Sequence, residues 1–376
     1  MKLVCWKSVS THNKAQIRPI TQSSISSTRD SSIRFRQLIL IMSIPSHPIY
    51  ILGLGSIGTL IAHCLRSLPQ PPPVKLLVHR KDLFDELASN EWKLGLRVQE
   101  DGPLNEQDGF EGELVHENTP AHPIHNLIVA VKASTTASAL KPLRHRIGPH
   151  TTICFFQNGL GQLDDLNERI FTETQSRPTY TCGIMYHGAY MKSPFETILT
   201  SRNGRAALGV IGDNSAAEER QSLYLLNVLL RSPILCCELL TWTDLLNAQL
   251  LKLAANCIIN PLTALLDVRN GSIKDNLHLR PVWTSLLREI SNVFERLPEL
   301  QNYPVRFSTE SLEAAVLGTV EKTAENSSSM REDVRKGRKT EIDYLNGWVI
   351  RRGKELGVNC EVNISITQLV LAKTSQ

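Results

Sequence analysis

Three polar side chains stand four residues apart in an otherwise apolar stretch in the second half of the chain. They are Lys252, Asn256 and Asn260, within the segment LLKLAANCIINPLTA at residues 250–264. On a helix, a spacing of four moves each side chain about 40° round from the last, so the three form one stripe roughly 12 Å long. The other faces carry Leu, Ile, Ala and Cys. Such a helix is expected to pack inside a domain.

A buried amine and two buried amides need partners. An unpaired buried polar group costs about 1–3 kcal/mol, and a desolvated lysine shifts its pKa unless something holds its charge. The stripe therefore lines a cleft or meets another polar surface. Pro261 is expected to kink the helix beside Asn260, because proline cannot donate to the carbonyl of Cys257. A capped helix whose lysine reaches solvent explains the helix alone equally well.

A glycine-rich turn near the start of the folded chain predicts a dinucleotide site. Residues 49–53, IYILG, read as a short apolar strand, GLGSIG follows at 53–58, and residues 59–68 have helical character. In this context G-x-G-x-x-G is informative: the first glycine allows the turn, the second admits a pyrophosphate and the third packs helix on strand. The amides at the helix start then hold the phosphates. The predicted cofactor contacts are Gly53, Leu54, Gly55, Ser56, Ile57 and Gly58.

The second predicted strand, residues 74–79, suggests which dinucleotide binds. It follows the stiff segment PQPPP and ends in His79, Arg80 and Lys81. An NAD site usually places Asp or Glu here, to bind the ribose 2′-hydroxyl. Two cations favour the 2′-phosphate of NADP, and Arg80 can stack on adenine while its donors reach the phosphate. We therefore predict NADP(H); the alternative is a solvated surface pair.

Polar residues follow two further predicted strands. The predicted strand at 127–131 is followed directly by Lys132, and the predicted strand at 151–156 is followed by Gln157 and Asn158. Open α/β sheets bind ligands at the carboxyl ends of their strands, so these tips are expected beside the glycine turn. Either tip alone could be ordinary turn chemistry. The remaining elements expected in this domain are strands at 179–186 and 206–211 and a helix near 216–230.

The pattern changes near residue 240, from mixed strands and helices to long helical patterns. We therefore predict an α/β fold with an N-terminal Rossmann-type domain at 48–240 and an all-helical C-terminal domain at 241–376. Residues 101–125 read as loop. Helices are expected at about 279–297, 308–325 and 340–357.

Between the last two predicted helices lie a serine run at 326–333 and a basic run at 335–339. Such runs are most often a flexible linker and a solvated face. Residues 340–344, TEIDY, argue against a plain linker, because acidic and bulky apolar residues interleave there.

Charge separates a basic leader from a nearly neutral body. The net charge is +4, but residues 1–50 hold seven Lys/Arg and one acid, leaving 34 basic and 36 acidic residues beyond them. Nothing in the body suggests nucleic acid or an anionic membrane as a partner, and the apolar run at 38–42 is too short to span a bilayer. The leader, residues 1–47, suits a mitochondrial transit peptide. Alternatively Met42 is the true start, and the protein is cytoplasmic.

Cysteine and histidine usage gives no sign of a metal centre. The eight cysteines lack CxxC spacing and mostly lie in apolar runs, so we expect reduced core residues. His116, His122 and His125 are the nearest thing to a ligand cluster. Their surroundings are rich in Pro, Gly and Asn, which favours a surface loop over a metal site.

With these pieces placed, the chain resembles the ketopantoate reductase (2-dehydropantoate 2-reductase) family over roughly residues 48–370. GLGSIG is generic to Rossmann folds. The two longest matching segments, at 252–265 and 328–347, contain many residues that are uncommon in such positions, so together they are specific for this family. The matching segments are GLGSIG at 53–58, VK at 131–132, QNG at 157–159, KLAANCIINPLTAL at 252–265 and SSMREDVRKGRKTEIDYLNG at 328–347.

The resemblance implies an oxidoreductase acting on CH–OH groups, with its active site in the cleft between a Rossmann and a helical domain. NADPH would reduce 2-dehydropantoate to (R)-pantoate there, on the route to pantothenate and coenzyme A. Carried over by position, the family's catalytic lysine falls on Lys252 and its partner carboxylate on Glu341. A protonated amine can stabilise and protonate the ketone oxygen as hydride arrives. Glu341 would oppose the loss of the lysine's charge by burial.

The resemblance also implies the substrate and cofactor contacts. Its substrate-binding asparagines fall on Asn256 and Asn260, and the serine that holds the substrate falls on Ser329. Residues 186–203 offer no side chain to which a role can be given. Lys132 and Asn158 match the junction of cofactor and substrate, and Arg80 matches the cation at the 2′-phosphate.

Two other functions stay open. The chain could reduce another branched 2-keto acid, or it could be a non-catalytic NADP-sensing protein on the same scaffold. In each case the expected partner is a small molecule, and the chain is expected to be a monomer or a homodimer.

Overall fold

The glycine-turn segment folds into strand β1 (Ile49–Leu52), a turn and helix α2 (Ser56–Arg66), as predicted. The computed structural model describes residues 47–116, 122–201, 203–212, 219–301 and 307–375. The predicted leader lies outside these ranges except for His47. The transit peptide, the start at Met42 and the compartment therefore stay predictions.

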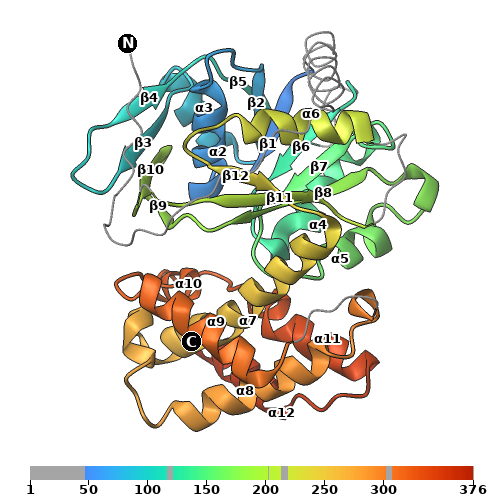
Figure 1. Cartoon of the computed structure of the whole chain (residues 1–376). Coiled ribbons are helices and arrows are strands. Elements are labelled where there is room, and N and C mark those ends of the chain that lie inside the picture. The colour runs from blue at the N-terminus through green and yellow to red at the C-terminus, as the bar shows by residue number, and fades with distance from the viewer. Residues whose placement is uncertain (1–46, 117–121, 202, 213–218, 302–306, 376) are drawn as a thin grey trace, which may run out of the picture. The chain divides into compact units, whose positions relative to one another are not determined.

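Eight strands form the main sheet, and all neighbouring pairs are parallel except β8 and β11. Parallel sheets are covered on both faces, which is why the short strands at 49–52 and 126–129 consist of buried residues. The order is β12 (Cys237–Leu239), β11 (Ala206–Val210), β8 (Thr179–Met185), β7 (Thr152–Phe155), β6 (Asn126–Val129), β1, β2 (Val74–Val78) and β5 (Glu111–Leu114) (Figure 1).

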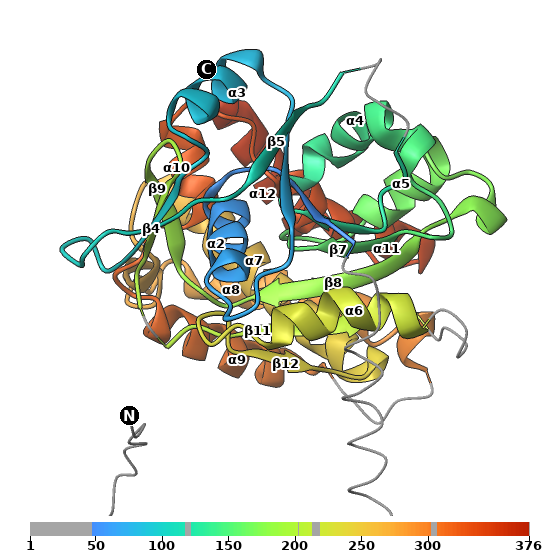
Figure 2. The same cartoon turned by 90° about the horizontal axis from the view of Figure 1, so that it is seen from above.

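Each face of this sheet carries its own apolar cluster. Successive side chains of a strand point to opposite faces, so Ile49 and Ile51 join one cluster while Tyr50 and Leu52 join the other. Helices α2, α3 (Lys81–Ser89) and α6 (Glu219–Leu230) cover the first face, and α4 (Thr136–Leu140) and α5 (Gln162–Arg169) cover the second (Figure 2).

A second sheet of four strands was not predicted. It contains β4 (Asn105–Gln107), β3 (Leu94–Val98), β10 (Glu196–Leu199) and β9 (Ala189–Ser193), in that order. The reading of residues 101–125 as loop is therefore wrong for β4 and β5. These strands are only three to five residues long, and β3 pairs with β10 about a hundred residues away. The local sequence pattern therefore does not predict them. Helix α2 packs against both sheets (Figure 1).

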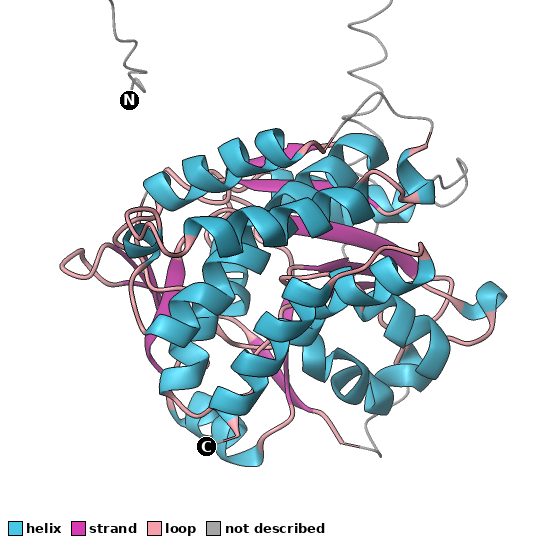
Figure 3. Ribbon diagram, turned by 90° about the horizontal axis from the view of Figure 1, so that it is seen from below, coloured by secondary structure: helices cyan, strands magenta, loops and turns pink. Residues whose placement is uncertain are grey.

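The described residues from 242 to 375 are helical or irregular, as predicted for the C-terminal part. They share one apolar core, to which α7 contributes Leu253 and Ile258 and α8 contributes Trp283 and Phe294. The predicted boundary near residue 240 falls between β12 and α7, and it stays a prediction. The helices are α7 (Trp242–Leu266), α8 (Arg280–Phe294), α9 (Thr309–Lys322), α10 (Ser329–Arg335), α11 (Asn346–Glu355) and α12 (Glu361–Thr374) (Figure 1). Seen from below, the molecule shows mostly helices (Figure 3).

Helix α7 is 25 residues long and apolar enough to cross a membrane by length and composition alone. About two-thirds of its most apolar window is buried within the protein, as in the core helix of a folded domain. Thr241 caps it by accepting from the amide of Asp244. The helix continues through Pro261 to Leu266, so the proline does not end it.

One prediction in the C-terminal region is confirmed and one needs correction. The serine run is not a plain linker, as the sequence indicated, because Ser328 accepts from the amide of Arg331 and so starts α10. The helix predicted from 340 starts late: residues 342–344 form a single 3-10 turn, and the α-helix begins at Asn346. The backbone of Leu345, with φ −105° and ψ −101°, interrupts the helical pattern there.

Buried amides join the last helix to this core. Asn363 has no exposed surface; its Nδ2 donates to Glu289 at 2.7 Å and its Oδ1 accepts from Asn346 Nδ2 at 2.9 Å. Glu289 also accepts from the amides of Val362 and Asn363. It therefore satisfies the first amides of α12, whose N-cap residue, Cys360, makes no side-chain cap.

Replacement of Asn363 by Ala is expected to lower the free energy of unfolding by about 1–3 kcal/mol, because Glu289 and Asn346 each lose a buried partner. Urea denaturation measures the change. Gln368→Ala, at an exposed position of the same helix, is the control and should stay within about 0.5 kcal/mol of the wild type. Equal losses in the two variants would show that the network contributes no net stability.

Candidate active site

The turn after β1 has a backbone that suits a phosphate ligand. Gly53 has φ +102°, and a Cβ there would lie 2.7 Å from the amide nitrogen of Val131. A Cβ on Gly58 would lie 1.8 Å from the carbonyl oxygen of Gly53, so the third glycine allows the turn to close on itself. At Gly55 an added Cβ meets nothing within 4 Å. The middle glycine thus faces open space, where a pyrophosphate can approach.

Helix α2 begins at this turn with its first amides uncapped. Gly55 is the N-cap residue, and no side chain accepts a hydrogen bond there. The amides of Ser56, Ile57 and Gly58 stand at the positive end of an 11-residue helix. Leu54 lies in the turn itself, where its carbonyl accepts from Thr59 Oγ1. These residues fit the phosphates of a dinucleotide.

The cations after β2 differ in their partners. Lys81 Nζ lies 2.8 Å from Asp85, whereas Arg80 Nε lies 3.8 Å from Asp82 and its side chain is 67% exposed. Burial lowers the pKa of His79, which favours the neutral ring. Arg80 is therefore the cation best placed to take a new anionic partner. Because β2 adjoins β1, it stands at the same edge of the sheet as the glycine turn.

Lys252 extends from α7 to the end of β8. Its Nζ donates to the carbonyl oxygen of Met185 at 2.8 Å and lies 5.9 Å from the ring centroid of Tyr186. Burial lowers the pKa of Lys252 to about 8, while the charge of Glu341 acts in the opposite direction. The amine is thus mostly protonated at neutral pH yet close to losing its proton, as suits a general acid.

Lys252 shares a pocket with two of the predicted residues, Asn158 and Asn256. Asn158 comes from the tip of β7, and Asn256 lies one turn along α7. The pocket has both polar and apolar walls, which suits a small polar molecule with an aliphatic part. Its lining is completed by Gln157, Gly159, Leu160, Cys182, Ile184, Gln249 and Leu253.

Glu341 does not hold Lys252 by direct contact, as far as the described residues show. Its Oε1 accepts from the amide of Ala133 at 2.9 Å, and it also hydrogen-bonds the side chain of Asn158. Burial raises the pKa of Glu341, whereas the amide of Ala133 and the charge of Lys132 lower it. Its effect on the lysine is smaller than that of burial. The predicted carboxylate partner therefore acts at longer range than expected.

Lys132 joins the tip of β6 to the segment after α10. Its Nζ lies 2.5 Å from Asp333 Oδ2 and donates to the carbonyl of Lys339 at 3.1 Å. Asp333 is buried and also pairs with Arg338 at 3.0 Å. The same segment meets the next strand tip, where the amide of Leu160 donates to the carbonyl of Tyr344. Residues 333–344 thus lie against the carboxyl ends of β6 and β7.

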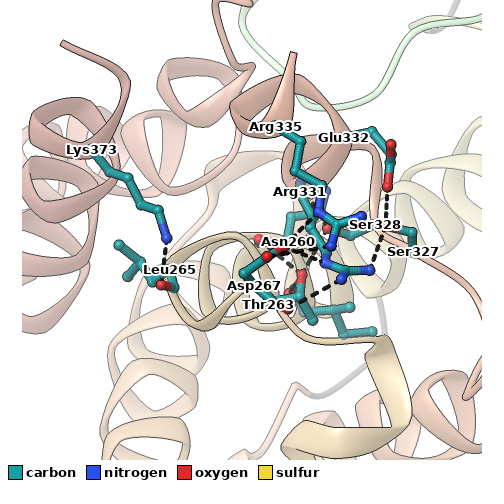
Figure 4. Close-up of polar contacts among 11 residues, drawn as sticks. Asn260, Thr263, Leu265, Asp267, Ser327, Ser328, Arg331, Glu332, Arg335 and Lys373 are labelled. Atoms are coloured by element: carbon teal, nitrogen blue, oxygen red, sulfur yellow. Dashed lines mark hydrogen bonds and ion pairs between the residues drawn. The ribbon is translucent and has the colours of Figure 1, made fainter. Parts of the chain in front are cut away.

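Asn260 and Ser329 lie outside the pocket lining. Asn260 is 7% exposed, and Ser329 is an exposed residue at the start of α10. Figure 4 shows how α10 is fixed on α7. Ser328 hydrogen-bonds Thr263 at 2.7 Å. Asp267, at the end of α7, accepts from Arg331 at 2.9 Å and from Arg335 at 2.7 Å.

Several pocket residues were missed by the sequence reasoning. Gln249 precedes Lys252 by three positions, so it shares a helix face with it and could have been found from the stripe. Cys182 and Ile184 line the pocket because alternate residues of β8 face it. Tyr186 follows Ile184 by two residues, and its ring lies on the same side of the chain, toward Lys252. No local signal marks these strand residues, because their role depends on where α7 packs.

Metal-ligating groups do not gather in the part of the chain that the structure describes, where no three His, Cys, Asp or Glu side chains could hold an ion. His125 stacks on His47 with centroids 4.0 Å apart, and His122 is exposed. The seven cysteines in the described ranges are free. Five of them are buried, as predicted, whereas Cys236 is exposed and Cys237 is half-buried.

Comparison with known proteins matches both parts of the chain to one family. Residues 49–213 match the family model described as ketopantoate reductase PanE/ApbA. Residues 244–374 match the model described as ketopantoate reductase PanE/ApbA C terminal. The two matches together cover most of the main sheet and nearly all of the helical region.

Three curated relatives have related activities. The 2-dehydropantoate 2-reductase of Saccharomyces cerevisiae is 29% identical, over 85% of this chain and 93% of that protein. The enzyme of the same name from Yersinia pestis is 30% identical, over 69% of this chain and 78% of that protein. The ketoisovalerate reductase of Beauveria bassiana is 26% identical, over 85% of this chain and 81% of that protein.

Solved structures confirm the fold. The ternary structure of D-mandelate dehydrogenase with NADH and anilino(oxo)acetate superposes with a TM-score of 0.71 at 20% identity, covering 88% of this chain and 98% of that one. A probable 2-dehydropantoate 2-reductase from Bacillus subtilis has a TM-score of 0.61 at 25% identity, covering 87% of this chain and 100% of that one. The predicted Rossmann-type fold with a helical C-terminal region is thus confirmed.

A methyl group at Gly55 is expected to block a dinucleotide without disturbing the fold. Gly55→Ala meets no neighbour in the protein and its backbone, with φ −75°, suits alanine. We expect its Kd for NADPH, measured by calorimetry, to rise about tenfold or more, since the second glycine admits the pyrophosphate. Gly318→Ala, at another glycine with open space around its Cβ, is the control. Equal affinity of Gly55→Ala and the wild type would place the phosphates elsewhere.

Proposed function

The chain belongs to the ketopantoate reductase family, and on that premise we propose that it reduces 2-dehydropantoate to (R)-pantoate with NADPH, in the synthesis of pantothenate and coenzyme A. The observation that carries the proposal is Lys252. It is a half-buried amine with a pKa of about 8, in a pocket at the ends of β7 and β8. Curated relatives that are 2-dehydropantoate 2-reductases support it.

We assign the cofactor to the edge of the sheet at the glycine turn. The turn residues 53–58 would hold the pyrophosphate, and Lys132 and Asn158 would lie at its junction with the substrate. Bound there, NADPH supplies the hydride. Arg80 favours NADP over NAD, because its exposed guanidinium has only a distant acidic partner and suits a 2′-phosphate. The neighbour D-mandelate dehydrogenase was solved with NADH, so cofactor choice rests on Arg80.

Residues of the protein then stabilise the negative charge that develops on the ketone oxygen of the substrate. Lys252 Nζ donates a hydrogen bond and finally a proton to the ketone oxygen, as the carbon is reduced. The Lys252 ammonium is held in place by the Met185 carbonyl until substrate takes its hydrogen bond. Glu341, fixed by the amide of Ala133, favours the charged lysine from a distance. Asn256, Asn260 and Ser329 are the proposed substrate contacts, of which Asn256 lines the pocket.

Ketoisovalerate is the second candidate substrate, because a fungal relative that reduces it matches most of this chain. The two keto acids differ in polarity: 2-dehydropantoate has a terminal hydroxyl that ketoisovalerate lacks. The pocket contains Asn256, and Gln157 Oε1 is buried without a partner among the described residues. A site with polar groups left unpaired discriminates against the substrate that lacks the hydroxyl. This favours 2-dehydropantoate.

A keto-acid panel tests the substrate and the acid together. We expect wild-type protein to oxidise NADPH with 2-dehydropantoate at a higher kcat/KM than with ketoisovalerate. Lys252→Ala should lose about 100-fold or more in kcat while still binding NADPH, since general acid catalysis contributes that much. Lys322→Ala, on the exposed side of α9, is the control. Full kcat in Lys252→Ala would refute the acid, and tight NADPH binding without turnover of any keto acid would favour a sensor.

Replacement of Arg80 by Ala tests the cofactor. We expect the KM for NADPH to rise about tenfold or more and the KM for NADH to change much less, because the charged guanidinium is proposed to bind the 2′-phosphate, which NADH lacks. Lys81→Ala is the matched control, since Lys81 is already paired with Asp85. An unchanged ratio of the two KM values in Arg80→Ala would contradict the assignment.

A further inference from the structure

The end of β8 contacts the Lys252 ammonium twice. The carbonyl of Met185, the last residue of the strand, accepts from Nζ at 2.8 Å. The ring of the next residue, Tyr186, has its centroid 5.9 Å from the same nitrogen. Tyr186 belongs to the segment for which neither the sequence nor the family resemblance gives a role.

The position of the Tyr186 ring is set by β11 as well as by β8. Its backbone amide donates to the carbonyl of Arg205 at 2.9 Å, which continues the antiparallel pairing of the two strands. The guanidinium of Arg205 lies 5.1 Å from the ring centroid and pairs with Glu238 at 3.0 Å. Tyr186 also follows Cys182 and Ile184 at the spacing of two that puts strand residues on one face, and both of those line the pocket.

An aromatic face attracts a cation but not a neutral amine. The ring therefore stabilises the protonated form of Lys252, against the burial that lowers its pKa to about 8. Among the described residues, the other charged or titratable groups near this contact are Cys182 on β8, Glu341, and the pair formed by Arg205, just before β11, with Glu238 on β12. Cys182 is a neutral thiol, because burial raises its pKa to about 12.

We propose that Tyr186 is a positioning residue for the reduction, whose ring holds the Lys252 ammonium beside the pocket in its protonated form. This rests on the proposed function, in which Lys252 is the acid. The residue type matters through its π face and not through its hydroxyl. Tyr186 is 40% exposed, so its side chain can be changed without opening a cavity in the core.

The test compares the pH dependence of kcat/KM in Tyr186→Phe and Tyr186→Leu, because this parameter reports the pKa values of the free enzyme. Activity needs the ammonium, so kcat/KM should be constant below the lysine pKa and fall above it. Tyr186→Phe keeps the ring and should match the wild type. Tyr186→Leu should move the alkaline limb down by about half a pH unit or more. It should retain near wild-type kcat/KM at about pH 6, where Lys252 is charged in every variant.

Tyr190→Leu is the matched control, a tyrosine on β9 that is 41% exposed and should leave the profile unchanged. A profile of Tyr186→Leu that superposes on the wild type would overturn the proposal. A KM of Tyr186→Leu that is raised at every pH, with the alkaline limb unshifted, would also overturn it, since the ring would then contact the substrate. A Tyr186→Phe limb displaced as far as that of Tyr186→Leu would implicate the hydroxyl and also overturn it.

A second measurement does not depend on turnover. Lysine labelled at Cε can be titrated by NMR in the full chain, with the Lys252 signal identified by its loss in Lys252→Arg. A lower Lys252 pKa in Tyr186→Leu than in the wild type supports the contact. An unchanged pKa overturns it, whatever the reaction. If the wild type reduces no keto acid while this shift is present, the proposed function fails and the effect of Tyr186 on the lysine stands.

Discussion

The hydrogen bond from Lys252 to the Met185 carbonyl joins the helical region to the sheet at the point where the chemistry is proposed. An amine taken out of water loses much of its preference for the charged form, so its neighbours decide its protonation. Here the lysine projects from a helix whose other faces are buried in an apolar core, which leaves its side chain little choice of direction. The carboxyl end of β8 supplies the partner that it meets.

The segment from α10 to residue 344 makes a second set of contacts, with the residues that follow β6 and β7. Asp267 and its two arginines fix α10 on the end of α7, as Figure 4 shows. Beyond α10, the Lys132–Asp333 pair and the bond from Ala133 to Glu341 attach the chain to the tips of β6 and β7. Asp333 is buried, and a buried charge without its partner is costly, so its pair with Lys132 favours one position of this segment. Glu341 thus lies outside the pocket lining and contacts it through the side chain of Asn158, at the tip of β7.

Local patterns were enough to predict the parts of the site that depend on neighbours in sequence. The glycine turn is one example, since the whole G-x-G-x-x-G pattern lies within residues 53–58. The stripe on α7 is another, because helical spacing places Asn256 with Lys252. What depends on strand pairing or on packing between distant segments was not predictable in this way. The β3–β10 pair, the contact of Glu341 with Ala133 and the position of Tyr186 all belong to that group.

The pH dependence of kcat/KM for reduction of 2-dehydropantoate by the wild-type protein tests the central claim most directly. If Lys252 is the acid, its pKa of about 8 in the free protein sets the alkaline limb. Initial rates with NADPH should then give a constant kcat/KM near neutral pH and a fall of about tenfold per pH unit well above about pH 8. A kcat/KM that stayed constant from about pH 7 to 10 would contradict the account, because a deprotonated lysine cannot supply the proton.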